Sequence, residues 1–131
     1  MAALGSLRRY YVTATTMQGA FRAFVAAHPE GPGSQDGSLF PQFIAHLSVW
    51  YATLYTAWEG WHELGIRDPD LDRAWEHPFR QRLQGFRDAT MRFRAEHFDK
   101  QLTEFAGAPE SAAFVLGVHL ALGKAIAAQP E

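Results

Sequence analysis

Residues 38–65 read SLFPQFIAHLSVWYATLYTAWEGWHELG and carry the strongest structural pattern in the chain. Large apolar side chains recur there at alternating intervals of four and three residues: Phe40, Ile44, Leu47, Tyr51, Leu54, Trp58 and Trp61. Because 3.6 residues make one turn of an α-helix, this spacing places them all on one side of a helix. Ser38 fits an N-cap, and Gly65 fits a stop at the other end. The stretch therefore predicts a long helix with a wide buried face.

The opposite face of this helix is small or polar. It carries Ala45, Ser48, Ala52, Thr56 and Glu59. Small side chains let a neighbouring backbone come close, so we expect this face to allow the close approach of another helix.

Outside this stretch the pattern is also helical. Three further main helices are predicted, over about residues 6–27, 78–100 and 110–128. The segment 28–37 holds two prolines and three glycines, which exclude a helix or a central strand and predict a loop. Asp68 before Pro69 predicts the start of a short connecting helix. No strand pattern competes, so we expect a single all-α domain over 1–131, an up-and-down bundle of four main helices plus a short connecting helix.

Composition excludes several classes of protein. The chain has 131 residues, of which 47% are hydrophobic and 20% charged, and this suffices for one packed domain. The absence of cysteine excludes disulfides, zinc–thiolate sites and a cysteine nucleophile. A net charge of −2 argues against a wholly basic nucleic-acid-binding protein. Neither a secretory signal nor a membrane-spanning pattern is evident, so we expect a cytoplasmic protein without a membrane partner.

A Phe-Arg dipeptide recurs at intervals of seven residues. Its copies are Phe79-Arg80, Phe86-Arg87 and Phe93-Arg94. Seven residues make nearly two helical turns, so the phenylalanines share one side of a helix and the arginines the next. Residues 79–94 hold five arginines and one acid, Asp88, and such a row could grip phosphate groups. The alternative is that the arginine stems cover the edge of the core while the charged heads stay in water.

Two stretches carry a resemblance to known proteins. The run 50–61, WYATLYTAWEGW, followed by residues 63–65 and 68–69, resembles a group of small uncharacterised bacterial helical proteins. Residues 86–93, FRDATMRF, fall where those proteins have Arg-Asn-x-x-x-His-Phe. That pattern is similar to the motif of the HEPN family, in which an arginine and a polar residue precede a histidine. The resemblance covers roughly residues 40–125.

The resemblance has concrete implications. HEPN domains are helical bundles, usually dimeric, and many cleave RNA without a metal. It implies that Arg87 steadies the scissile phosphate and that Asp88 orients the site. The position of the histidine, which in the family moves a proton from the ribose 2′-hydroxyl, is occupied here by Arg92. Arginine stays protonated and cannot act as a general base. The resemblance therefore implies a homodimer without a cofactor, non-catalytic or divergent, that binds RNA or phosphate or regulates a partner. Any remaining enzyme activity would be that of a metal-independent ribonuclease.

Several residues near the motif have two interpretations. Arg92 followed by His97 also fits the loose motif, which makes His97 a candidate catalytic residue, but His97 also continues the apolar stripe as a core or edge histidine. Asp88 and Arg92 are four residues apart and could form an ion pair on the helix surface. Glu59 is either a site acid or a structural carboxylate, which would face solvent or form an interhelical ion pair, with Arg87 as the candidate partner.

The sequence thus defines one candidate site and one competing function. The candidate catalytic residues are Arg87, Asp88 and His97, and the candidate phosphate- or ligand-binding residues are Arg80, Arg87, Arg92, Arg94 and Glu59. No two histidines are three or four residues apart, and Glu59 with His62 or Glu63 would supply only half of a bundle metal site, so no metal is expected. The competing function is a bundle that binds a protein or an apolar ligand, whose aromatic residues fill the core or line a pocket or interface.

Overall fold

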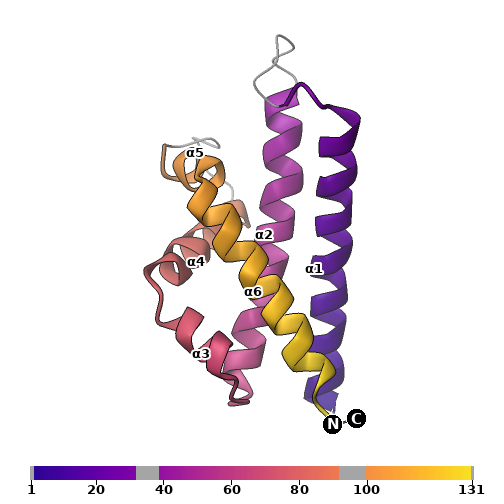
Figure 1. Cartoon of the computed structure of the whole chain (residues 1–131), viewed down its shortest axis with the longest axis vertical. Helices are drawn as coiled ribbons and strands as arrows, with labels where there is room; N and C mark the ends of the chain where they lie inside the picture. The colour runs from indigo at the N-terminus through magenta and orange to yellow at the C-terminus, as the bar shows by residue number, and fades with distance from the viewer. Residues whose placement is uncertain (1, 32–38, 92–99, 131) are drawn as a thin grey trace.

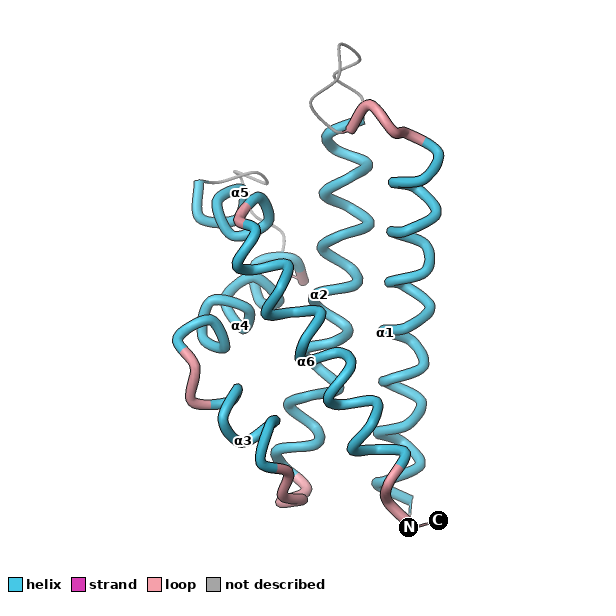
Figure 2. Tube along the Cα trace, viewed as in Figure 1, coloured by secondary structure: helices cyan, strands magenta, loops and turns pink. Residues whose placement is uncertain are grey.

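The computed structural model describes residues 2–31, 39–91 and 100–130, and these form six helices (Figure 1). The helices are α1 (Ala2–Ala27), α2 (Leu39–Glu63), α3 (Pro69–Trp75), α4 (Pro78–Thr90), α5 (Lys100–Gly107) and α6 (Pro109–Ala127). Figure 2 shows only helices and loops in the described part of the chain. The all-α class expected from the sequence is confirmed.

α2 is the central helix, and its stripe is buried as the spacing predicts. It lies antiparallel to α1 in a long hairpin (Figure 1). Six of the seven stripe residues are buried: Ile44, Leu47, Tyr51, Leu54, Trp58 and Trp61. The helix ends at Glu63, and Gly65 follows with a φ of 71°, the left-handed conformation that stops a helix and favours glycine. The predicted N-cap, Ser38, lies outside the described residues.

α3 and α4 begin where the sequence predicts, each at a capping side chain. The carboxylate of Asp68 accepts hydrogen bonds from the backbone N–H groups of Asp70 and Leu71. The ring of His77 accepts one from the N–H of Phe79. Each cap precedes a proline at the first helical turn, where the missing N–H is not needed. These two starts turn the chain so that α4 packs against α2.

The third main helix is shorter than the sequence pattern suggests. It ends at Thr90 instead of near residue 100, and a separate helix, α5, begins at Lys100. Met91 caps the end with ψ at 0°, outside the helical range, and its N–H still bonds to the carbonyl of Arg87. Neither glycine nor proline marks this end, so the prediction from periodicity alone made the helix about ten residues too long. Residues 92–99, with the third Phe-Arg pair, lie outside the described part of the chain.

α6 closes the fold by running obliquely across α2, and it brings the C-terminus beside the N-terminus (Figure 1). Arg8 on α1 donates a hydrogen bond to the carbonyl of Gln129 at 3.1 Å, which joins the two ends. Within the described residues, α6 is the one helix whose length and apolar composition would suffice to cross a membrane. One side of it is nonetheless part of the protein core, through Val115, Val118, Leu122, Ala125 and Ile126.

Most of the aromatic residues of α2 fill the core. Trp58 packs edge-on against Tyr55 and Trp75 and lies tilted against Phe114, which joins α2 to α3 and α6. Tyr51 is 1% exposed, and burial raises its pKa to about 12, so it stays a neutral phenol. Aromatic packing therefore fixes the framework that positions α4.

Candidate functional site

Arg87 lies on α4 and faces the polar side of α2. Its Nη1 donates to Glu59 Oε1 at 3.1 Å and to Thr56 Oγ1 at 3.3 Å, and its Nη2 donates to Glu59 Oε2 at 3.4 Å. Its Nε donates to Asp88 Oδ1 at 2.8 Å. The Tyr55 ring lies against the guanidinium, with its centroid 4.9 Å from Cζ. The predicted interhelical ion pair of Arg87 with Glu59 is confirmed. We call these five residues the Arg87 cluster.

The Arg87 guanidinium is neutralised within its cluster, and the cluster as a whole carries excess negative charge. The side chain of Arg87 is 17% exposed, whereas those of Glu59 and Asp88 are 32% and 49% exposed. Burial alone would lower the pKa of Arg87, but hydrogen bonds to Glu59 and Asp88 hold it above its ordinary value. Two carboxylates surround one guanidinium, and four of its five N–H donors bond within the cluster. The cluster therefore offers little to an incoming anion.

Arg80, one heptad earlier on α4, is also bonded to the protein. Its Nε donates to the carbonyl of Trp75 at 3.0 Å, and its Nη1 donates to Gln84 Oε1 at 3.2 Å. The Trp75 ring centroid lies 4.5 Å from its Cζ. Tyr55 donates to the same Gln84 oxygen at 3.3 Å, which links Arg80 to the Arg87 cluster. Burial raises the pKa of Tyr55, so its hydroxyl remains a donor. Arg80 thus fastens the corner between α3 and α4.

The remaining candidate residues lie outside the described part of the chain. These are Arg92, Arg94 and His97. Their roles, and the ion pair of Asp88 with Arg92, stay predictions. Of the expected site, the structure brings together Glu59, Arg87 and Asp88, and it links Arg80 to them through Gln84.

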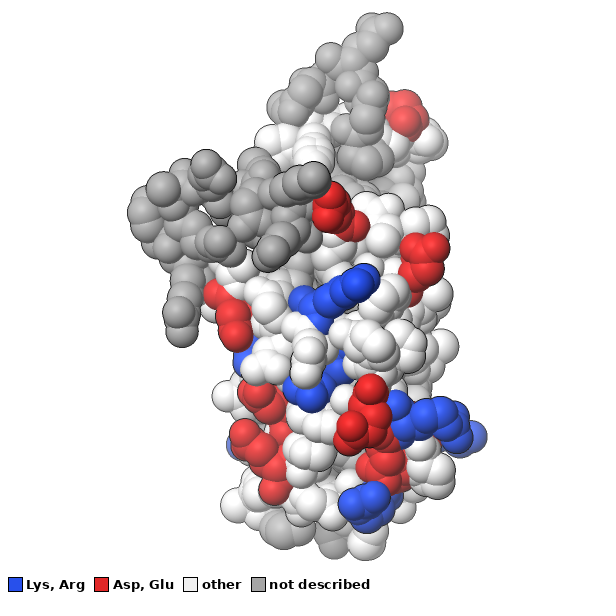
Figure 3. All heavy atoms as spheres, turned by 90° about the vertical axis from the view of Figure 1, so that its left-hand side faces the viewer, with Lys and Arg blue, Asp and Glu red and all other residues white. Residues whose placement is uncertain are grey.

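The surface around these residues is mixed in charge. Figure 3 shows the face that carries α3 and α4, where Lys and Arg atoms lie among Asp and Glu atoms. Arg82 is exposed on α4 and lies over the ring of Phe79, with 5.1 Å between its Cζ and the centroid. Two ion pairs, Arg67 with Asp72 and Arg73 with Asp70, occupy α3 and the turn before it. The described part of this face therefore lacks the continuous basic surface typical of nucleic-acid-binding proteins.

A metal site finds no support in the described residues. They contain no group of three His, Asp or Glu side chains that could hold a metal ion. Glu59 is engaged by Arg87, and His62 stacks on Trp75 with ring centroids 3.9 Å apart. Of the half-site that the sequence suggests, Glu59 is therefore used in an ion pair and His62 in ring stacking.

His119 forms a second polar centre, which the sequence analysis did not single out. It lies on α6 and is 2% exposed. Trp50 Nε1 donates to its Nδ1 at 3.0 Å, and its Nε2 lies 3.0 Å from Thr15 Oγ1. Because an indole N–H can only donate, Nδ1 accepts and Nε2 carries the proton. Burial, and then the charge of Arg22, lower the pKa of His119. The only sequence signal was a histidine within the otherwise apolar run 112–123 of α6.

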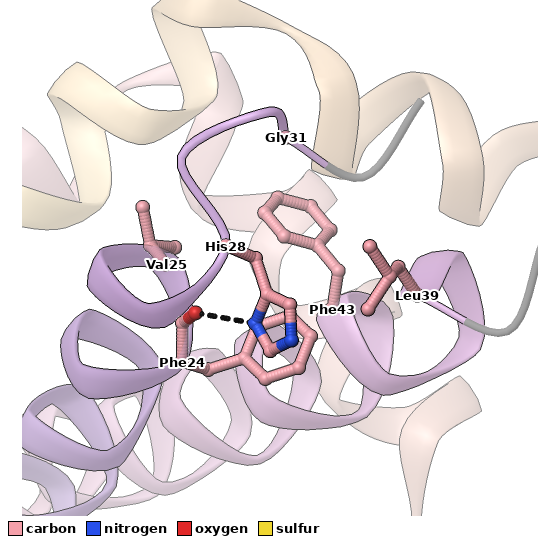
Figure 4. Close-up of a pocket in the computed structure, with 6 residues that line it drawn as sticks. All are labelled: Phe24, Val25, His28, Gly31, Leu39 and Phe43. Carbon is pink, nitrogen blue, oxygen red and sulfur yellow. Dashed lines mark hydrogen bonds between the residues drawn. The ribbon is translucent and has the colours of Figure 1, made fainter. Parts of the chain in front are cut away.

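A small apolar hollow lies where α1 and α2 meet at the end of their hairpin (Figure 4). It is lined by Phe24, Val25, His28, Gly31, Leu39 and Phe43. His28 Nδ1 donates to the carbonyl of Phe24 at 2.9 Å, so the lining presents little free polarity to a ligand. Gly31 and Leu39 of its lining stand on either side of residues 32–38 in the sequence, which lie outside the described part of the chain.

Comparison with family models, with curated proteins and with solved structures finds no match to this chain. The candidate site is therefore interpreted from its own chemistry and from the motif resemblance.

Proposed function

We propose that this chain is a divergent, non-catalytic relative of the HEPN domains that acts as a regulatory dimer through contacts with protein. The observation that carries the proposal is the neutralised guanidinium of Arg87. The guanidinium that the motif resemblance assigns to phosphate is bound to Glu59 and Asp88. The resemblance supports the dimer, and the state of Arg87 supports a role without phosphate chemistry.

Phosphate binding at Arg87 would be opposed by the two carboxylates. A phosphate could reach the guanidinium well only by displacing Glu59 or Asp88, and the displaced carboxylate would lose its counter-charge. Leaving a partly buried charge unpaired is costly, and a phosphate would add to the negative charge already present. These effects favour an arginine that fastens α4 to α2.

In the motif register that places Arg92 at the histidine position, a ribonuclease reaction would also lack its proton acceptor. A general base must lose and regain a proton near neutral pH. Arg92, at the histidine position of the motif, remains protonated. Asp88, at the polar position of the motif, is already engaged as the acceptor of a hydrogen bond from Arg87. This set of residues supports a non-catalytic protein.

Contact with another protein is supported by exposed apolar side chains. Leu116 and Leu120 lie one turn apart on α6 and are 36% and 64% exposed, and Val12 on α1 is 61% exposed. Scattered exposed apolar residues are ordinary, but neighbouring ones on one helix face are typical of interaction surfaces. The surface of α6 therefore favours association with protein over binding of RNA.

The test measures RNA retention and oligomeric state on the same preparation. We expect the wild-type protein to leave labelled single-stranded and structured RNA unshifted at low salt and to sediment as a dimer. Arg87→Met should leave RNA retention at background, and so should Arg82→Ala, a matched change at an exposed arginine of the same helix. Circular dichroism checks that each variant stays helical.

Two results would contradict the proposal. Retention of RNA by the wild type that Arg87→Met abolishes and Arg82→Ala preserves would establish phosphate binding at the motif arginine. Sedimentation as a monomer over the whole accessible concentration range would exclude the dimer.

A further inference from the structure

α6 presents an apolar face to solvent. The opposite side of the helix is buried in the core, whereas the outward side carries four exposed residues that we call the α6 outer face: Ala113, Leu116, Gly117 and Leu120. Leu120 is 64% exposed. Burying a leucine side chain is strongly favourable, and this face leaves that gain unused in a single chain.

Two opposite charges flank the α6 outer face. Glu110 lies in the first turn of α6 and Lys124 in the last, and both are exposed. They are the only Asp, Glu, Lys or Arg residues in the sequence of this helix. They are 14 residues apart in the sequence, nearly four turns, so they share one side of the helix about 21 Å apart. Gly117 lies midway between them.

We propose that a second copy of this chain docks on the α6 outer face, with the two α6 helices antiparallel and the two-fold axis at Gly117. In this register, Glu110 of each copy faces Lys124 of the other, because both residues are seven positions from the axis. The inference rests on the proposed regulatory dimer and assigns its interface.

The charge pattern selects a second copy as the occupant. A two-fold interface brings the same surface together from both copies, so that surface must complement itself when its direction is reversed. The α6 outer face does so, with an acid at one end, a base at the other and apolar residues between them. Parallel pairing would bring like charges together. Each charge also suits its own end of the helix dipole, but that does not explain the exposed leucines between them.

The shape of the α6 outer face also suits close approach. A Cβ added at Gly117 would meet nothing within 4 Å, so no side chain of its own copy covers this position. Small residues at the crossing point let two helix backbones come close. Leu116 and Leu120 would then pack beside the axis, and the charged pairs would lie at the wetter rim.

The experiment reverses one charge at a time and then mixes the variants. Glu110→Lys leaves both ends of the helix positive, and Lys124→Glu leaves both ends negative, so each variant should repel its own copies. In an equimolar mixture, both introduced charges face opposite charges again. Fluorescence-detected sedimentation, with one variant labelled, measures self-association and mixed association separately.

We expect each variant alone to self-associate about tenfold more weakly than the wild type, and the mixture to recover wild-type strength. Recovery on mixing shows that both variants are folded, because a misfolded chain would not be rescued by its counterpart. Glu63→Lys and Arg82→Glu, reversals at exposed positions of α2 and α4, should leave self-association unchanged.

The outcomes separate this interface from the proposed function. A wild-type dimer whose strength neither reversal changes would overturn the α6 interface and leave the regulatory dimer standing. Variants that weaken association but show no recovery on mixing would overturn the antiparallel register. A wild-type protein that is monomeric throughout would overturn both.

Discussion

At the scale of single residues, His119 shows how a buried titratable group is held in one protonation state. The indole N–H of Trp50 can only donate a hydrogen bond to Nδ1 of His119. A proton on Nδ1 would therefore point at this N–H and abolish the bond. Tyr11 also donates to the carbonyl of His119, at 2.9 Å, and its ring lies edge-on to the imidazole. The link from α6 to α2 through Trp50 therefore exists only while the His119 ring is neutral, whereas the contacts with Thr15 and Tyr11 on α1 do not require a neutral ring.

This arrangement predicts a pH dependence of stability. The pKa of His119 in the folded protein lies below its ordinary value of 6.5, first because of burial and then because of the charge of Arg22. The unfolded chain therefore binds a proton at His119 more readily than the folded chain does. We expect this contribution to the free energy of unfolding to be complete above pH 6.5, to fall as the pH drops below it, and to level off below the lowered pKa.

The measurement is urea unfolding of the wild type and His119→Gln between pH 8 and pH 5. Glutamine can keep a donor and an acceptor near Thr15 and Trp50 but does not titrate, and the other histidines are common to both proteins. The wild type should lose more stability than the variant over this range. Parallel pH curves would show that His119 titrates alike in the folded and unfolded chains.

Gly123 supplies a second prediction at this scale. A Cβ at this position would overlap the hydroxyl of Tyr11 and lie 2.8 Å from its ring carbon Cζ. Because Tyr11 is fixed by its bond to His119, we expect Gly123→Ala to lower the free energy of unfolding by about 1–3 kcal/mol. Gly85→Ala is the control, since its Cβ meets nothing within 4 Å, and it should stabilise α4 by up to about 1 kcal/mol. Equal effects of the two changes in urea unfolding would refute the close contact.

At the scale of elements, α3 is held at its start by a cap and at its end by stacking. Asp68 accepts two backbone hydrogen bonds, each at 3.1 Å. At the other end, the ring of Trp75 packs against His62 and lies beneath the guanidinium of Arg80. Since Leu71 is the buried residue of this seven-residue helix, the two ends carry much of its attachment.

The cap should have a measurable effect on stability. Asp68→Ala removes the acceptor for two N–H groups, and we expect it to lower the free energy of unfolding by about 1 kcal/mol. Asp68→Asn keeps a side-chain oxygen at the same place and should have an effect of at most a few tenths of a kcal/mol. Chemical denaturation compares the three proteins, and an equal loss in both variants would assign the effect to charge instead of to capping.

The elements were predicted well where local signals exist. The 4,3 spacing predicted the buried face of α2, Asp68-Pro69 predicted the start of α3, and the helix expected from about residue 78 matches the start of α4. The end of α4 at Thr90 was not predicted, and α1 begins at Ala2, earlier than expected. The apolar pattern continues past Thr90 with no glycine or proline to interrupt it, so the end of α4 depends on packing. At the other point, α1 continues through Gly5 back to Ala2.

At the scale of the whole molecule, association and stability should be linked. If two chains pair through the α6 outer face, dilution shifts the equilibrium toward the less stable single chain. For a dimer of this length, we expect Tm to rise by about 2–3 °C for each tenfold increase in protein concentration. Leu120→Ser should flatten this dependence, because it removes apolar area from the interface while Leu120 is 64% exposed in the single chain.

Differential scanning calorimetry over a wide concentration range measures this effect. Met91→Ser is a suitable control, since Met91 is 58% exposed and lies at the end of α4, not on α6. It should keep the concentration dependence of the wild type. A wild-type Tm that is independent of concentration would count against association of the folded chains.

The sequence by itself determined the helical class, the buried face of α2 and the arginines of α4, because periodicity and caps depend on residues within about one turn of each other. It also offered Glu59 as a partner of Arg87, but as one of several alternatives. Only the tertiary structure decided that the guanidinium lies against Tyr55 and is neutralised by Glu59 and Asp88. It likewise decided that His119 is a neutral link between three helices. Both outcomes depend on how helices distant in sequence pack together, and that geometry sets which charges and hydrogen-bonding groups meet away from water.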